Sequence, residues 1–254
     1  EQPSTCRCPR CGGSLASSAV IRAALFDLGG VIFTSPFDAF ARYERARGLP
    51  VGFIRRVNAA NPDENAWARL ERGGVSFEEF CDLFQGEARA LGGEIDAREV
   101  MELVEGDVRP EMLEAVRRCH ERLKTGLLTN NWVTVDGARK MPADRSPTGA
   151  RGMSANASPN VAAAGPRKIE EALRHFDVVI ESSRVGVRKP DPRFYRMACG
   201  QLGIEPAEAV FLDDLGVNLK PARDMGMTTI KVVDAARAID ELERVVGFPL
   251  RAGS

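Results

Sequence analysis

Four short apolar runs in the sequence each lead into a polar residue, and this repeated pattern constrains the fold more than any other feature. The runs end at Asp27, Thr129, Glu181 and Asp213. Parallel strands buried on both faces have apolar sequences, and ligands bind beyond the carboxyl ends of such strands. We therefore expect the polar ends to meet at one crevice. For Asp27 alone, which precedes a glycine pair, the simpler interpretation is a residue that caps a turn.

Helix signals fall between the later apolar runs. They predict helices over 110–123, 167–176, 191–203, 218–226 and 234–247, and a further strand over 228–233. Pro110 suits a first helical residue, and Asp191 and Asp234 suit N-terminal caps. Strands separated by helices of this length indicate a parallel, doubly wound α/β sheet of Rossmann type. We place its first strand at 20–26.

The segment between the first two apolar runs has a different pattern. Aromatic residues recur there at helical spacing, with no convincing strand signal: Phe37, Phe40, Tyr43, Phe77, Phe80 and Phe84. A direct crossover between parallel strands needs only about a dozen residues, far fewer than separate Asp27 from Leu127. The sequence therefore predicts a helical cap domain at 37–107, inserted into a core formed by 20–36 and 108–250.

Composition narrows the class of protein. The chain has 254 residues, of which 44% are hydrophobic and 28% charged, enough for one substantial core and a smaller second domain. A net charge of −1 without a long basic run argues against nucleic acid or an anionic membrane as a partner. With no bilayer-spanning stretch or secretory signal, we expect a soluble intracellular protein, either cytoplasmic or organellar (mitochondrial or peroxisomal). The first residue is Glu1, so the chain could be a fragment of a longer protein.

Two segments have too few large apolar residues to fix their own structure. Residues 1–19 are expected to be a flexible tail, and residues 140–166 a mobile loop within the core. Cys6, Cys8 and Cys11 lie in the tail and resemble one half of a zinc ribbon. A structural zinc needs four ligands and no second pair follows, so we favour the tail interpretation. The glycosylation sequon at 156–158 is interpreted as a chance match.

The residues at the ends of the apolar runs, or in the loops beside them, suit phosphoryl transfer: Asp27, Thr129, Asn130, Lys189, Asp213 and Asp214. Asp27 can attack phosphorus and form an aspartyl-phosphate. Its carboxylate, a main-chain carbonyl and one acid of the 213–214 pair offer the oxygen ligands that Mg²⁺ prefers. Thr129 and Asn130 supply donors for the remaining phosphoryl oxygens, and Lys189 offsets the negative charge.

These residues also have simpler interpretations when taken singly. Adjacent acids such as Asp213 and Asp214 are often only solvated, although two carboxylates held together in a crevice favour a bound cation. Lys189 before a proline would be a surface lysine in a turn. Lys220 is expected to be a helix-surface charge, although it could reach toward the acids. The two histidines fall in helical patterns and are not expected to be catalytic.

Four motifs in order resemble those of the haloacid dehalogenase-like hydrolases. They are Phe-Asp-Leu-Gly-Gly-Val at 26–31, Leu-Thr-Asn-Asn at 128–131, Gly-Val-Arg-Lys-Pro-Asp-Pro at 186–192 and Val-Phe-Leu-Asp-Asp-Leu-Gly-Val-Asn-Leu-Lys at 210–220. The chain looks most like the N-terminal phosphatase domain of soluble epoxide hydrolase and the corresponding domain of multidomain acyl-CoA dehydrogenases. The resemblance covers about 20–250 and is specific for the superfamily rather than for a substrate.

The resemblance implies a role for each motif residue. Asp27 would be the nucleophile, magnesium would be bound by Asp27, the Gly29 carbonyl and Asp214, and the helical insert would act as a lid. Phosphate would be held by Thr129, Asn130 and Lys189: these three residues lie on two different motifs. Phosphatases of this family typically carry a second aspartate at the position occupied by Gly29, which protonates the leaving alkoxide and later activates water.

The glycine at position 29 leads to a hypothesis about activity. Loss of a positioned acid–base group typically costs about a hundredfold to ten-thousandfold in rate. We expect a magnesium-dependent phosphomonoester hydrolase that is slow on alkyl phosphates and better on aryl or acyl phosphates. A catalytically weak domain with a regulatory or interaction role in a larger acyl-CoA dehydrogenase-type protein is the first alternative, and Gly29 favours it. A metal-independent 2-haloacid dehalogenase ranks third, because its site should lack the acidic pair.

Overall fold

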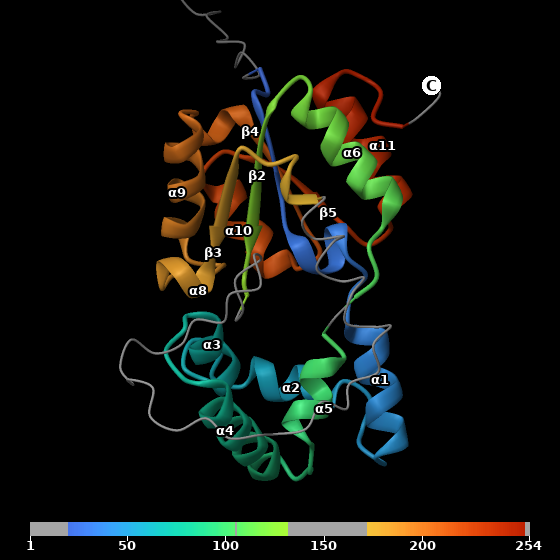
Figure 1. The fold of residues 1–254 in the computed structure, drawn as a ribbon, viewed down its shortest axis with the longest axis vertical. Helices are drawn as coiled ribbons and strands as arrows, with labels where there is room; N and C mark the ends of the chain where they lie inside the picture. Colours follow the sequence, from blue (N-terminus) through green and yellow to red (C-terminus); the bar gives the residue numbers. More distant parts are fainter. Residues whose placement is uncertain (1–19, 105, 132–171, 252–254) are drawn as a thin grey trace, which may run out of the picture.

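The computed structural model describes residues 20–104, 106–131 and 172–251, and a parallel sheet forms its centre (Figure 1). The sheet order is β3-β2-β1-β4-β5. The strands are β1 (Ala23–Phe26), β2 (Lys124–Thr129), β3 (Val178–Glu181), β4 (Ala209–Asp213) and β5 (Thr228–Lys231). Phe26 is paired with Leu127 on one side and Leu212 on the other. This register places Asp27 level with Asp213 at the carboxyl ends of the two central strands.

Both faces of the sheet are covered by helices, because alternate strand residues point to opposite faces. In β1, Ala24 and Phe26 belong to the apolar cluster shared with α6 (Pro110–His120) and α11 (Ala235–Val246). Ala23 and Leu25 belong to the cluster shared with α9 (Pro192–Leu202) and α10 (Gly216–Asp224). Figure 1 shows α9 and α6 on opposite sides of the strands. The predicted doubly wound α/β sheet is confirmed.

Most helix ends in the core follow the predicted signals. Asp191 accepts a hydrogen bond from the Arg193 N–H at 2.9 Å at the start of α9. Asp234 caps α11, which ends at Val246 and is followed by Gly247, where φ is +79°. The short elements of the core are η1 (Leu28–Ile32), α8 (Ser182–Val185) and η2 (Pro206–Glu208). α10 starts at Gly216, two residues earlier than predicted, and the side chain of Asn218, which was expected to open the helix, donates to Asp213.

The cap consists of α1 (Phe37–Ala46), α2 (Phe53–Ala59), α3 (Ala66–Glu71), α4 (Phe77–Ala90) and α5 (Ala97–Glu102). These helices bury their own apolar cluster, which includes the stacked rings of Phe80 and Phe84. The two chain segments that enter and leave the cap run side by side, joined by an antiparallel bridge between Phe33 and Val108. In Figure 1 the cap lies beyond the carboxyl ends of the strands. The predicted helical insertion is therefore present.

Several expectations lie outside the described residues. They concern the tail at 1–19 with Cys6, Cys8 and Cys11, the loop at 140–166, and the start of the helix predicted at 167–176. β1 begins at Ala23 rather than at the predicted residue 20, although the Arg22 N–H still donates to the Glu208 carbonyl at 2.7 Å. In the described part of the chain, no helix has the length and apolar character needed to cross a membrane.

Candidate active site

Three carboxylates lie together at the carboxyl ends of β1 and β4. One oxygen atom each of Asp27, Asp213 and Asp214 lies within 4.8 Å of the other two. Asp27 is 9% exposed and Asp213 is fully buried. The Asp27 N–H donates to the Leu212 carbonyl at 2.9 Å, which continues the pairing of β1 with β4 past the end of the strand. The backbone of the sheet thus fixes the relative position of these acids.

Lys189 provides the positive charge at this cluster. Its Nζ lies 2.8 Å from Asp27 Oδ1 and 2.8 Å from Asp213 Oδ2, and the residue is only 1% exposed. Burial alone lowers the pKa of a lysine, but the charges of Asp213 and Asp27 outweigh that effect and raise the pKa of Lys189. The lysine therefore remains a buried cation that bridges two strands.

The two adjacent acids have different surroundings. Asp213 accepts hydrogen bonds from the Leu215 N–H at 2.8 Å and from Asn218 Nδ2, which lies 3.0 Å from each carboxylate oxygen. With Lys189, these donors fix the Asp213 carboxylate. Asp214 instead lies beside the turn that follows β1. The resemblance singled out Asp214 as a magnesium ligand, but the sequence did not predict the contact of Asn218 with Asp213, since that contact depends on the fold of the loop after β4.

The glycine pair after Asp27 shapes the space in front of the carboxylates. Gly30 has a φ of +75°, and a Cβ at this residue would lie 2.3 Å from Asp214 Oδ2. A side chain there would collide with the acid, so only glycine fits. Gly29 has ordinary extended angles (φ −72°, ψ 134°), and a Cβ would meet no atom within 4 Å. The sequence showed the pair, but the requirement at Gly30 becomes visible only in the structure.

Burial makes the ionised forms of two acids costly. It raises the pKa of Asp27 to about 8, with Lys189 opposing the rise and the charges of Asp213 and Asp214 adding to it. Burial, followed by the charge of Asp213, also raises the pKa of Asp214 to about 6. Three carboxylates thus share one lysine, and a divalent cation is the natural partner for the remaining negative charge. This oxygen-only donor set fits Mg²⁺.

The remaining predicted residues lie at the end of β2. Thr129 is its last residue and is 3% exposed. Asn130 holds the backbone of Lys189: its Oδ1 accepts from the Lys189 N–H at 2.9 Å and its Nδ2 donates to the Lys189 carbonyl at 3.1 Å.

The side chain of Lys220 is 75% exposed and pairs with Asp224. The helix-surface interpretation of Lys220 is confirmed.

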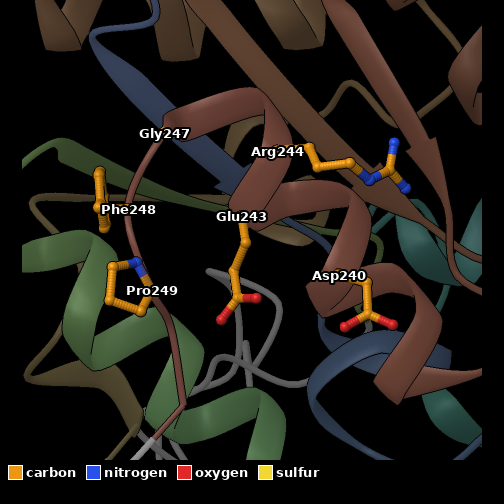
Figure 2. A pocket seen from close by; sticks show the side chains of 6 residues that line it. All are labelled: Asp240, Glu243, Arg244, Gly247, Phe248 and Pro249. Carbon is orange, nitrogen blue, oxygen red and sulfur yellow. The ribbon is translucent and has the colours of Figure 1, made fainter. Parts of the chain in front are cut away.

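A separate surface depression of about 530 Å³ lies along α11 and the segment after it (Figure 2). It is lined by Asp240, Glu243, Arg244, Gly247, Phe248 and Pro249. Arg251 already pairs with two of its acids, at 2.7 Å from Asp240 and 3.1 Å from Glu243. None of the predicted site residues lines this depression.

The family follows from comparison with known proteins. The model for haloacid dehalogenase-like hydrolases matches residues 21–226, and the chain belongs to that family. Acyl-CoA dehydrogenase family member 10 of Mus musculus is 31% identical over 238 residues, which cover 91% of this chain and 20% of that protein. Bifunctional epoxide hydrolase 2 of Sus scrofa is 33% identical over 242 residues, which cover 91% of this chain and 40% of that protein.

A third relative is close to this chain in length. Phosphatase MT3486 of Mycobacterium tuberculosis (strain CDC 1551 / Oshkosh) is 29% identical over 240 residues, which cover 88% of this chain and 93% of the relative. The chain therefore spans a fifth to two fifths of the first two relatives and nearly all of the third. The resemblance to epoxide hydrolase and acyl-CoA dehydrogenase proteins is confirmed.

Proposed function

We propose that this chain is a magnesium-dependent phosphomonoester hydrolase that works through an aspartyl-phosphate on Asp27. The observation that carries the proposal is the Lys189 ammonium, which lies 2.8 Å from both Asp27 and Asp213, with an Asp214 oxygen within 4.8 Å of an oxygen of each of these two acids. Membership of a hydrolase family and the presence of a phosphatase among the relatives support it.

Asp27 is held ready for attack. Its Oδ1 accepts the Leu28 N–H at 2.7 Å and faces Lys189, so the carboxylate has little freedom to lose on reaction. In the proposed first step a carboxylate oxygen bonds to phosphorus while the bond from phosphorus to the ester oxygen breaks. Water then cleaves the acyl-phosphate and releases inorganic phosphate. Lys189 stabilises the charge on the phosphoryl oxygens in both steps.

Thr129 and Asn130 complete the proposed phosphate site. The Thr129 hydroxyl is a donor at the end of β2. The side chain of Asn130 is engaged with Lys189, so we assign the Asn130 main-chain N–H to the phosphate and the side chain to holding the lysine. Thr129 would therefore bind the phosphate through its side chain, and Asn130 would bind it through its main chain.

Mg²⁺ would be held by Asp27, the Gly29 carbonyl and Asp214, with Asp213 behind them, and would neutralise the phosphoryl oxygens. The positions of the carboxylates support this assignment, because one oxygen atom each of Asp27, Asp213 and Asp214 lies within 4.8 Å of the other two. Gly30 supports it as well, since its missing Cβ leaves the space that the Asp214 carboxylate occupies. The donor set of the chain therefore fits the ion.

Gly29 sets the expected substrate preference. It offers no side chain where the resemblance places an acid–base aspartate, so departure of a poor leaving group receives no proton from this position. Rates on phosphomonoesters of graded leaving-group pKa, measured with and without Mg²⁺, test this. We expect a steep fall as the leaving group becomes more basic; a flat dependence, with chemistry shown to limit turnover, would contradict the assignment to Gly29.

A non-catalytic role is the second candidate, and Gly29 is the observation that favours it. Two of the relatives are much longer than this chain, and fusion to or association with other catalytic domains would suit a regulatory part. The wild-type chain would then release no phosphate even with Mg²⁺, and Asp27→Asn would behave like wild type.

The substrate of the favoured function is a small phosphate ester. A 2-haloacid dehalogenase stays in third place because Asp213 and Asp214 crowd the site with negative charge.

A further inference from the structure

The residue before Lys189 points away from the carboxylates and contacts the cap. Arg188 Nε lies 2.8 Å from Glu71 Oε2, at the end of α3, and Arg188 Nη1 donates to the Pro62 carbonyl at 2.9 Å. Figure 1 shows α3 directly beyond α8, which precedes this loop. We call the Arg188 guanidinium, the Glu71 carboxylate and the Pro62 carbonyl the cap latch. Sequence reasoning did not find it, because the partners are more than a hundred positions apart.

The cap latch is sheltered and well defined. The side chains of Glu71 and Arg188 are 11% and 22% exposed, so solvent screens their attraction less than at an open surface. The second oxygen of Glu71 accepts the Trp67 Nε1–H at 3.0 Å, which fixes the carboxylate on its own helix. Among ion pairs between described residues, this one alone joins the cap helices to the core.

The latch is coupled to the proposed chemistry through one peptide unit. Lys189 is held from the core side by Asn130, and its Nζ lies between Asp27 and Asp213. Arg188 is held from the cap side. Any movement that draws α3 away from the core therefore pulls on the loop that carries Lys189. Release of Arg188 would leave Lys189 held from the core side alone, by Asn130, Asp27 and Asp213.

The guanidinium suits this task better than an ammonium would. Arg188 Nε forms an ion pair with Glu71, and Arg188 Nη1 donates a hydrogen bond to the Pro62 carbonyl, so two nitrogen atoms contact different parts of the cap at the same time. A lysine presents a single nitrogen on a flexible stem and cannot fill both positions. Arginine thus ties both the turn at Pro62 and the helix α3 to the loop before Lys189.

We propose that Arg188 is a positioning residue whose contact with Glu71 holds the cap over the site and fixes the loop that carries Lys189. The expected effect on turnover rests on the proposed phosphohydrolase function. The expected effect of the Arg188–Glu71 contact on the loop does not depend on that function. A group misplaced by about 1 Å can cost about a hundredfold in rate, so a loop released on one side should lower turnover measurably.

The test compares Arg188→Gln, Arg188→Lys, Glu71→Gln and the double Gln variant in the full chain with Mg²⁺. Arg193→Gln is the matched control, because Arg193 lies five positions after Arg188, near the same loop, but pairs with Asp191 and not with the cap. We measure kcat and KM on p-nitrophenyl phosphate, and hydrogen–deuterium exchange of α3 and residues 187–190.

We expect kcat to fall about ten- to hundredfold in either single Gln variant, with a smaller change in KM and no further fall in the double variant. Exchange should quicken in both α3 and residues 187–190, and Arg188→Lys should lie between wild type and Arg188→Gln. Arg193→Gln should match wild type in both measurements.

Two results would overturn the proposal: kcat unchanged in the Gln variants, or kcat lowered without faster exchange of residues 187–190. An unchanged kcat would show that the Arg188–Glu71 contact does not affect phosphate release. A lowered kcat without faster exchange would indicate that Arg188 contacts the substrate directly. If the wild-type chain releases no phosphate, the proposed function fails, while the exchange data still decide the coupling. Unchanged exchange in both segments would then reject the latch by itself.

Discussion

At the scale of single residues, two adjacent glycines have opposite requirements. Gly30 needs to be glycine because its φ is positive and because Asp214 occupies the space a side chain would take. Gly29 has a conformation open to any residue and free space around it. The backbone at position 29 therefore does not require glycine, and a Cβ added there would meet no atom within 4 Å. Two substitutions test these statements.

The first is Gly29→Asp. We expect turnover of alkyl phosphates to rise by about tenfold or more, because the new carboxylate can protonate the leaving oxygen, while turnover of aryl phosphates changes less. Phosphate release from both substrate types measures the ratio. Gly29→Asn, with the same shape and no proton to give, serves as control. Equal rates for the two variants would show that position 29 does not face the leaving group.

The second compares Gly30→Ala with Gly29→Ala. The added methyl group at position 30 would lie 2.3 Å from Asp214 Oδ2 and strain a positive φ, so we expect a loss of about 1 kcal/mol or more in unfolding free energy and weaker Mg²⁺ binding. Gly29→Ala should change neither by much. Denaturant unfolding and Mg²⁺ titration provide the readouts. A stable, magnesium-competent Gly30→Ala protein would contradict the close contact seen here.

At the scale of elements, the strand ends could be predicted from the sequence and the contacts between loops could not. Apolar runs ending in Asp27 and Asp213 specify parallel strands, and strand register brings these acids level. Asn218 was correctly placed near a helix start, yet its contact with Asp213 depends on how the loop after β4 turns. The pairing of Arg188 with Glu71 joins two separately folded parts, and no local pattern encodes such a contact.

The carboxylates at these strand ends predict how magnesium binding depends on pH. The pKa values of Asp27 and Asp214 are raised from the ordinary 3.8 to about 8 and about 6, so the folded metal-free protein keeps protons that the unfolded chain has released. Its stability should therefore fall as pH rises across that window. Mg²⁺ displaces these protons, so its stabilising effect should grow from about pH 5.5 to about pH 8.5.

Thermal unfolding with and without Mg²⁺ at several pH values measures this effect. Asp214→Asn serves as the control, because it removes a proposed ligand and one titrating group together. We expect a small Mg²⁺-induced rise in Tm at acid pH and a larger one at alkaline pH in wild type, with little rise at any pH in the variant. A shift that is independent of pH would contradict protonated carboxylates at the metal site.

At the scale of the whole molecule, the cap and the sheet have separate apolar interiors. Phe80 lies fully buried in the cap cluster, whereas Phe194 lies fully buried against the sheet. Phe80→Ala should cost about 3–5 kcal/mol, and faster hydrogen exchange should be confined to residues 37–104. Phe194→Ala should instead quicken exchange in the core. Exchange that spreads equally through both parts in each variant would indicate one cooperative unit rather than a cap with its own core.

The central claim is that Asp27 attacks phosphorus, and a quenched single-turnover reaction tests it most directly. Without an acid–base side chain at position 29, water should attack the acyl-phosphate slowly, so the intermediate should accumulate. Acid quench, borohydride reduction and peptide mass spectrometry locate the phosphorylated residue. We predict Mg²⁺-dependent modification of Asp27 and loss of turnover in Asp27→Asn. A label on another residue, or turnover that survives in Asp27→Asn, would contradict the account.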